Sequence, residues 1–393
     1  MRPILLRPRS RGECLSGCCL AAAVVCLVLL AACIGLGIWW WRSSHPAPAP
    51  TPGATPVQAS PAPPVATSDP SPAGVGGSVQ RWLSGARLKE PAVSGSLVLY
   101  PIELSSPTGP PVAVAGALNA REYASPYSPS TGPLLPTEAP GSNGNVVVLQ
   151  NPLDRPLLVP GGWLLVGGRQ DRCLPHDLML EPQSGPMTTE IYCVEEGRSF
   201  YRAEDLKGPD ADRFRADLGL ASLTVRAALD QKGTWQAIEA LRAAVGPALA
   251  PKTSLYTVQE QVPNLEALSR PLLQLPQQHP GMTGAVVQLG REVLAVEVFS
   301  SREAFLQLWP DLLRSYVLQA TADPGRAVPD SGMATRFLQE APARHWSELS
   351  QDRARVLMAR DGGWRADAVS WDGQLVHAFL IRPRVVQGDL KTF

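Results

Sequence analysis

The sequence predicts an α+β fold, made mainly of antiparallel strands and hairpins with packed helices and preceded by one transmembrane helix. Short β-branched runs bounded by Pro and Gly predict strands, and other stretches carry the 3.6-residue period of helices. These strands and helices come in blocks rather than in strict alternation, which favours α+β over α/β. With 393 residues, 45% of them hydrophobic, the chain can bury a sizeable core. Its zero net charge gives no reason to expect a nucleic-acid partner.

An uncharged segment at residues 18–41 is long enough to cross a bilayer as a helix. It follows a basic stretch, residues 1–17, and ends in Trp39, Trp40 and Trp41, which suit the far membrane interface. The positive-inside rule therefore predicts a single-pass protein of the cell membrane, of bacterial type, with a cytoplasmic N-terminus and an extracytoplasmic main domain. In an alternative interpretation, Leu30–Cys33 is a lipobox and Cys33 is lipidated.

Residues 42–78 are rich in Pro, Ala, Ser and Thr and nearly free of charge and large apolar side chains. Such a segment cannot bury enough apolar surface to fold, so it is expected to be a disordered, extended linker. The globular domain is then predicted to occupy residues 79–393.

The first half of this domain is predicted to be β-rich. Residues 97–104 and 112–118 form two expected strands, and three closely spaced apolar runs follow at 146–151, 155–160 and 163–167. Because only short turn sequences separate the three runs, they are predicted to pair with one another as an antiparallel meander.

Residues 167–198 are predicted to form a β-hairpin that turns at Pro182–Gly185. Counting outward from this turn brings Cys173 and Cys193 nearly opposite each other. A disulfide between them is chemically allowed outside the cytoplasm, and two buried free thiols are the alternative. The sequence leaves both open.

Helical periodicity dominates the next region, and strands return near the end of the chain. The predicted elements are helices from Asp210 and from Thr234, two strands within 284–299 that turn at Gly290, a helix at 301–320, and three final strands that turn at 361–363 and at 372–373. Thr234 and Ser301 are the expected N-caps.

Five segments of the chain form a recognisable set, in this order: VVVLQNPLDRPLLVPGG, LVGGRQDR, IYCVEEGRSFYR, TWQAIEAL and GAVVQLGREVLAVEVFSSREAFLQLWPDLLRSY. Together they resemble a known family, the ARPP-1 domain. The resemblance covers roughly residues 97–381. It implies an association with ADP-ribosylglycohydrolases and rhodanese-phosphatases, without an assigned reaction. The family's recurrent polar positions fall on Gln170, Arg172, Glu195, Gly197 and Arg198.

The candidate ligand-binding residues lie at the outer ends of the predicted hairpin: Gln170, Arg172, Glu195 and Arg198. Two guanidinium groups and an amide could bind a phosphate or a carboxylate through charge-assisted hydrogen bonds. In the alternative, the side chains pair with one another, Arg198 with a glutamate and Arg172 with Asp171 or Asp177.

Other chemistries have weaker sequence support. Cys193 could act as a nucleophile beside His176, but a thiol within a strand is more often structural. Glu195 and Glu196 point to opposite faces of a strand, which disfavours a carboxylate pair. The His and Cys spacing fits no zinc site, and no cofactor-binding motif is present. The sequence therefore favours a binding or scaffolding domain, and its candidate partners are a protein or a nucleotide-derived small ligand. The rival is an enzyme or sensor for a phosphate-containing, NAD-derived ligand such as ADP-ribose.

Overall fold

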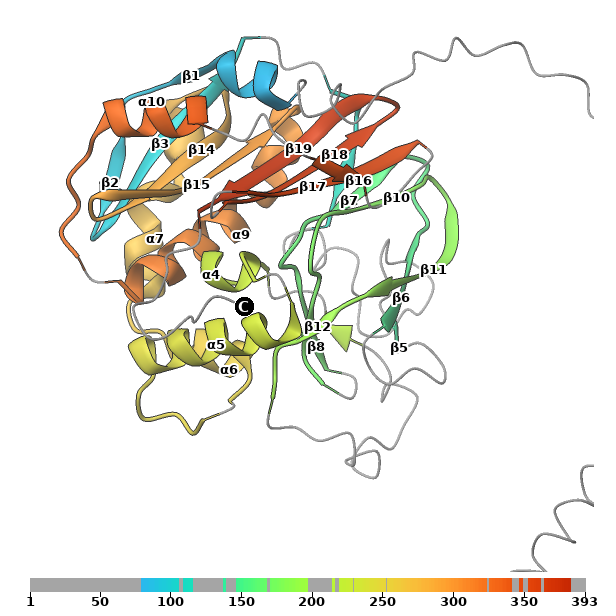
Figure 1. Cartoon of the computed structure of the whole chain (residues 1–393), viewed down its shortest axis with the longest axis horizontal. Coiled ribbons are helices and arrows are strands. Elements are labelled where there is room, and N and C mark those ends of the chain that lie inside the picture. Colours follow the sequence, from blue (N-terminus) through green and yellow to red (C-terminus); the bar gives the residue numbers. More distant parts are fainter. Residues whose placement is uncertain are drawn as a thin grey trace, which may run out of the picture. The chain divides into compact units, whose positions relative to one another are not determined.

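The computed structural model describes residues 79–105, 109–115, 137–138, 146–167, 170–196, 214–215, 219–228, 230–251, 253–323, 325–340, 346–348, 353–361 and 364–382. These residues form the predicted α+β fold, with mainly antiparallel sheets (Figure 1). Among them, no helix combines the length and the apolar character needed to span a bilayer. The expected transmembrane segment at 18–41 and the linker at 42–78 lie outside the described residues.

A nine-stranded sheet forms the centre of the domain, and its recorded pairings are antiparallel. Across the sheet the strands run in the order β1 (Ala86–Leu88), β3 (Leu97–Leu104), β14 (Met282–Leu289), β15 (Glu292–Phe299), β19 (Gln374–Ile381), β18 (Trp364–Trp371), β17 (Ala354–Asp361) and β16 (Trp346–Glu348), and β2 (Ala92–Ser94) also pairs with β3. Two distant parts of the chain thus meet at the centre, where β15 pairs with β19.

Three small sheets hold the strands between β3 and β14. The first contains β10 (Leu178–Leu180), β7 (Leu157–Val159) and β4 (Ala113–Val114); the second contains β11 (Ser184–Glu190), β6 (Val146–Asn151) and β5 (Thr137–Glu138); the third contains β12 (Tyr192–Cys193), β9 (Arg172–Cys173), β8 (Leu164–Gly167) and β13 (Phe214–Arg215). The pairing of β4 with β7 is parallel.

The helices pack on both faces of the large sheet and beside the third small sheet (Figure 1). They include a helical stretch at residues 79–84 and the helices α4 (Leu223–Arg226), α5 (Gln231–Val245), α6 (Leu255–Glu260), α7 (Leu265–Leu273), α8 (Leu275–Gln278), α9 (Arg302–Thr321) and α10 (Ser331–Glu340). Ser301 caps α9 as predicted, because its side chain accepts a hydrogen bond from the Ala304 amide. The cap of α5 is Asp230 rather than Thr234, since the Asp230 carboxylate accepts the Gly233 amide at 2.6 Å.

Alternation along the central strands divides the core between the two faces of the large sheet. In β3, Leu97 and Leu99 join the cluster that includes α9 and the small sheets, whereas Val98 and Tyr100 join the cluster that includes α10. A third cluster lies among α5, α6 and the sheet of β8 and β9. The structure confirms the long predicted strands and the helix at 301–320. Each of these elements carries a continuous buried face.

The pairing predicted for the first half of the domain is wrong. The strands β6, β7 and β8 exist, but each belongs to a different small sheet instead of forming a meander. The inner arms of the predicted hairpin also separate, since β10 pairs with β7 and β11 pairs with β6. Its outer ends, β9 and β12, do pair. Short runs of local sequence contain too little information to choose among several strand partners.

The predicted helix from Asp210 is also wrong. Residues 214–215 form strand β13, which pairs with β8, and α4 covers only Leu223–Arg226. Within the described residues, the helices α6, α7, α8 and α10 and the short strands β1, β2 and β16 were not predicted, because each is short and gains its burial from tertiary contacts.

Candidate functional site

The structure brings together three of the four predicted ligand-binding residues. One guanidinium nitrogen of Arg172 donates to the side-chain oxygen of Gln170 at 2.7 Å, and the Gln170 amide donates to the Glu195 carbonyl at 3.4 Å. Arg172 is completely buried and Gln170 is nearly so. Arg198 lies outside the described residues. The arrangement is thus a buried contact between two paired strand ends, in which Arg172 does not face solvent.

The two cysteines of this region are free and buried. Cys173 lies opposite Tyr192, and Cys193 lies opposite Arg172, so the predicted alignment of the thiols is off by one residue. Burial is the main reason why the pKa of Cys173 rises to about 12, and burial also raises the pKa of Cys193. The thiolate that nucleophilic attack by Cys193 beside His176 would require is therefore disfavoured.

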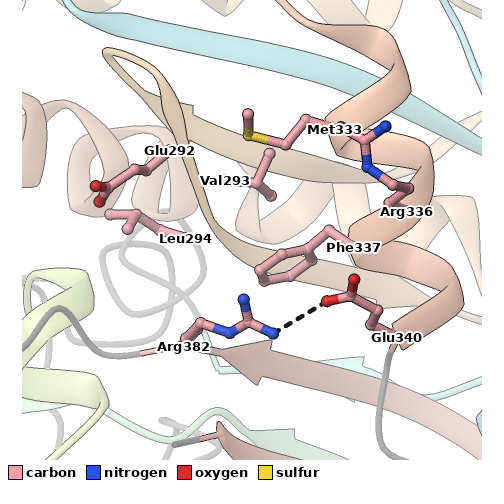
Figure 2. A pocket seen from close by; sticks show the side chains of 8 residues that line it. All are labelled: Glu292, Val293, Leu294, Met333, Arg336, Phe337, Glu340 and Arg382. Atoms are coloured by element: carbon pink, nitrogen blue, oxygen red, sulfur yellow. Dashed lines mark hydrogen bonds and ion pairs between the residues drawn. The ribbon is translucent and has the colours of Figure 1, made fainter.

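A surface groove lies between the start of β15 and helix α10 (Figure 2). Its volume is about 430 Å³, and its lining combines the apolar side chains of Val293, Leu294, Met333 and Phe337 with the charged side chains of Glu292, Arg336, Glu340 and Arg382. Arg382 donates to Glu340 at 3.1 Å, and its guanidinium lies 4.6 Å from the Trp364 ring centroid. The groove is open to solvent. Its recorded ion pair, between Arg382 and Glu340, is half-exposed, so the attraction between the two side chains is screened by water and contributes little energy.

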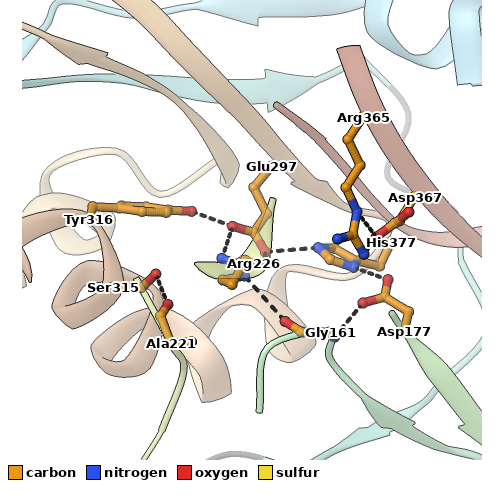
Figure 3. Close-up of polar contacts among 10 residues, drawn as sticks. All are labelled: Gly161, Asp177, Ala221, Arg226, Glu297, Ser315, Tyr316, Arg365, Asp367 and His377. Atoms are coloured by element: carbon orange, nitrogen blue, oxygen red, sulfur yellow. Dashed lines mark hydrogen bonds and ion pairs between the residues drawn. The ribbon is translucent and has the colours of Figure 1, made fainter. Parts of the chain in front are cut away.

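Among the residues that the structure describes, a connected group of ionisable side chains is instead buried between the large sheet and the small sheets (Figure 3). It comprises Asp177 from the loop before β10, Arg226 from α4, Glu297 from β15, Tyr316 from α9 and His377 from β19. We call these five residues the ionic core. Glu297 and His377 share one face of the sheet because Phe299, two residues after Glu297, pairs directly with His377.

Glu297 is the centre of the ionic core. Arg226 donates to both of its carboxylate oxygens, at 2.6 and 3.1 Å, and the Tyr316 hydroxyl donates at 2.7 Å. The Nε2 atom of His377 lies 3.1 Å from Glu297 Oε1, and its Nδ1 atom lies 2.5 Å from Asp177 Oδ2. The second oxygen of Asp177 accepts the Gly161 amide at 2.8 Å. The network therefore runs without a break from α9 through β15 and β19 to the loop of Asp177.

Two glycines in the turn between β7 and β8 allow the backbone to approach the ionic core closely. Gly162 has a φ of +83°, and a Cβ atom there would lie 2.3 Å from Cγ of Arg226. The carbonyl of Gly161 also accepts a hydrogen bond from Nε of Arg226 at 3.2 Å. Gly161 and Gly162 thus form the turn between the two strands, and their lack of side chains also makes room for the guanidinium group.

The ionic core is balanced in charge when His377 is protonated. Burial by itself would lower the pKa of His377, but Asp177 and Glu297 outweigh it and raise that pKa to about 9. Burial would raise the pKa of Glu297, but Arg226 and His377 hold it at about 2. The pKa of Asp177 is likewise lowered against the effect of burial, chiefly by His377. Two cations thus neutralise two anions, as charges removed from water require.

A second buried ion pair lies next to the ionic core. Arg365 donates twice to one oxygen of Asp367, at 2.8 and 3.1 Å, and also bonds the carbonyls of Pro175 and Ala228. These two carbonyls belong to the loop before β10 and to the segment that directly follows α4. The ionic core and the Arg365–Asp367 pair therefore both connect the large sheet to the loop before β10 and to the segment around α4. The contacts that both groups make are those of structural ion pairs.

The sequence prediction missed the ionic core. Asp177 was considered as an alternative partner of Arg172, but its carboxylate pairs with His377. The available signal was the placement of Glu297 and His377 within otherwise apolar strands, VLAVEVF and QLVHAFLI. A charged side chain at an inward position needs a partner of opposite charge. Which residue becomes that partner depends on which strands are neighbours. Within the part of the chain that the structure describes, no group of His, Cys, Asp and Glu side chains is placed to hold a metal ion.

Comparison with known proteins identifies the family. The model of the ARG and Rhodanese-Phosphatase-superfamily-associated Protein domain, ARPP-1, matches residues 85–381. Among curated proteins and among solved structures, no significant match was found. The matched range extends from β1 to the end of β19 and contains the whole ionic core and the buried contact of Arg172. The chain therefore belongs to the ARPP-1 domain family.

Proposed function

We propose that this protein is a single-pass membrane protein that displays its ARPP-1 domain outside the cytoplasm as a binding or scaffolding module. The observation that carries the binding role is the burial of the ionic core. Its charged side chains are at most 2% exposed, and each is engaged by another member. Breaking a group held in this way strongly destabilises a fold, so the ionic core maintains the domain, and its side chains are unavailable to a substrate from solvent.

The membrane anchor and the linker support the scaffolding part of this proposal. The apolar segment at 18–41 is long enough to span a bilayer, and the Pro-rich segment at 42–78 would hold the domain away from the surface. A reporter fused after Phe393 tests the orientation. Alkaline phosphatase is expected to be active and a fluorescent protein dark, as for an extracytoplasmic position. The reverse pattern would contradict the proposed topology.

The competing proposal is an enzyme or sensor for an NAD-derived phosphate ligand such as ADP-ribose. Its support is the contact that gathers Gln170, Arg172 and Glu195. Direct binding needs a guanidinium group that the ligand can reach, whereas Arg172 is 0% exposed. For this reason the binding module is the first proposal and the nucleotide-derived ligand is the second.

A thermal-shift experiment separates the two proposals. The protein is heated with NAD, with ADP-ribose and with inorganic phosphate, and the binding module predicts an unchanged Tm in each case. A Tm that rises with ADP-ribose in the wild type but not in Arg172→Ala would favour the second proposal. Chemical cross-linking of the full chain in its own membrane supplies the positive test. A discrete cross-linked species with another polypeptide is expected, and a monomer alone would count against scaffolding.

A further inference from the structure

A second pocket, of about 630 Å³, opens where the helices α6, α7 and α9 meet. Helix α7 packs beside α9 (Figure 1), and the side chain of Leu265 at its start packs against two of the three apolar clusters. Between α6 and α7 the chain makes a turn, in which the Val262 amide donates to the Gln259 carbonyl at 3.3 Å. The end of α6, the beginning of α7 and Arg314 of α9 therefore surround one space.

The first turn of the nine-residue helix α7 has backbone N–H groups without acceptors. The first amides of any α-helix lack a partner within the helix, and a side chain at the N-cap usually accepts one of them. The N-cap of α7, Asn264, makes no such bond. Among the backbone hydrogen bonds of the described residues, none has the amide of Leu265, Glu266 or Ala267 as its donor. All three residues line the pocket, so the positive end of the α7 dipole faces it.

Gln259 provides an independent sign that an acceptor belongs in this pocket. The residue is only 2% exposed, and its side-chain nitrogen is buried without a hydrogen-bond partner although the residue lines the pocket. Buried donors of this kind are rare in folded proteins. Within the described part of the chain, the side-chain oxygen of Gln259 has no hydrogen bond either. A half-turn of the amide group, which exchanges its two ends, therefore breaks no hydrogen bond and presents the nitrogen to a ligand.

Arg314 supplies a cationic group that a ligand can reach. Its side chain is 37% exposed, and its Nη2 atom donates to Glu260 at 3.3 Å. Its Nε atom is buried without a partner. The other carboxylate of the pocket, that of Glu266, is 87% exposed and accepts a hydrogen bond from Arg270 at 3.2 Å. Both buried side-chain atoms that lack a partner at this pocket are thus donors, on Gln259 and on Arg314.

The charges of the pocket favour a ligand with one negative charge. Free amides at a helix N-terminus and a guanidinium group bind acceptor oxygens through charge-assisted hydrogen bonds. The two arginines offset the two glutamates, so a doubly charged phosphate would be repelled by the nearby carboxylates more strongly than a carboxylate would. Val262 and Leu265 add apolar surface for the remainder of the ligand.

We propose that the pocket between α6, α7 and α9 binds a carboxylate. The free amides at the start of α7 hold its oxygens, and Arg314 and Gln259 complete the set of donors. This inference goes beyond the proposed function, because it assigns a class of ligand to one pocket whichever role the domain has.

Nuclear magnetic resonance of the isotope-labelled full chain in detergent tests the proposal with two matched probes. N-acetylleucine carries a carboxylate, and N-acetylleucinamide has nearly the same shape without the charge. N-acetylleucine is expected to shift the amide signals of Glu266 and Ala267 saturably, whereas N-acetylleucinamide is expected to leave them in place. A peptide that ends in Leu and binds more tightly than N-acetylleucine would identify a polypeptide C-terminus as the source of the carboxylate, and equal binding would indicate a small molecule; both results support the site.

Variants of the donors give the expected magnitudes. Arg314→Gln should weaken the binding of N-acetylleucine about tenfold, because a charge-assisted hydrogen bond is lost. Gln259→Leu removes an uncharged donor and should weaken binding about fivefold. The matched control is Arg336→Gln on α10, whose apolar side chains belong to the cluster on the opposite face of the large sheet, and it should leave binding unchanged. An unchanged Tm shows that each variant is folded.

Three results would overturn the proposal. The absence of a shift with N-acetylleucine, or equal shifts with both probes, would show that the pocket does not recognise a carboxylate. Saturable shifts with inorganic phosphate but not with N-acetylleucine would assign the pocket to a phosphate instead. Equal weakening by Arg314→Gln and Arg336→Gln would reduce the effect to the overall charge of the protein.

Discussion

Removal of the central carboxylate of the ionic core should destabilise the protein strongly. The substitution Glu297→Gln keeps the shape of the side chain but removes the negative charge that Arg226, Tyr316 and His377 share. The side chains of Glu297 and Arg226 are each 1% exposed, so water cannot replace the lost partner. Breaking a buried pair of this kind costs about 3–5 kcal/mol. We expect a loss of that size in the free energy of unfolding.

Urea unfolding followed by tryptophan fluorescence measures this loss. The matched control is Asp372→Asn, which breaks another two-bond pair, between Asp372 and Arg353 at 2.7 and 2.9 Å. Its two side chains are half-exposed, so water and salt already screen the attraction and only a small loss is expected. Comparable losses for Glu297→Gln and Asp372→Asn would refute the reasoning, because burial would then have no role in the energetics of the ionic core.

Three further predictions concern pH, backbone conformation and thiol reactivity. Because the pKa of His377 rises from 6.5 to about 9 on folding, the stabilisation by the protonated imidazole should be complete below pH 6.5 and lost as the pH rises through 9. Urea unfolding at several pH values should show this decline in the free energy of unfolding of the wild type and a flatter pH dependence for His377→Gln. Gly162→Ala, at a φ of +83° and with a clash at 2.3 Å, should lower stability more than Gly373→Ala, at a φ of +76° with open space, where strain alone costs about 1–3 kcal/mol; equal thermal shifts would contradict the role of close packing. Because both thiols are buried and have raised pKa values, Cys173 and Cys193 should resist maleimide in the native protein and react in urea, and peptide mass spectrometry that instead finds a bond between them would refute the free-thiol state.

Part of the candidate site was predictable because its residues lie on adjacent strand ends. Gln170, Arg172 and Glu195 meet as expected, since β9 and β12 pair even though the rest of the predicted hairpin does not. The burial of Arg172 could not be predicted in the same way. It depends on segments from other parts of the chain that cover these strands, and local periodicity contains no information about them.

By itself, the sequence determined the elements whose signals are local. Proline and glycine positions, alternation and capping residues were sufficient for β3, for the β14–β15 pair, for α9 from its cap at Ser301, and for the strands β17, β18 and β19. Each of these elements is at least eight residues long, so that the pattern of its own residues specifies it.

Only the tertiary structure decided which strands became neighbours and which charges met. The ionic core joins Asp177, Arg226, Glu297 and His377, and the closest two of these four, Asp177 and Arg226, are still 49 residues apart in the chain. The sequence shows that a buried Glu297 and a buried His377 each need a partner. The partner is selected by the pairing of β15 with β19 and by the packing of α4 and the Asp177 loop against them. Charge pairing acts over a few ångströms of space and not along the sequence, so the fold has to form before the network exists.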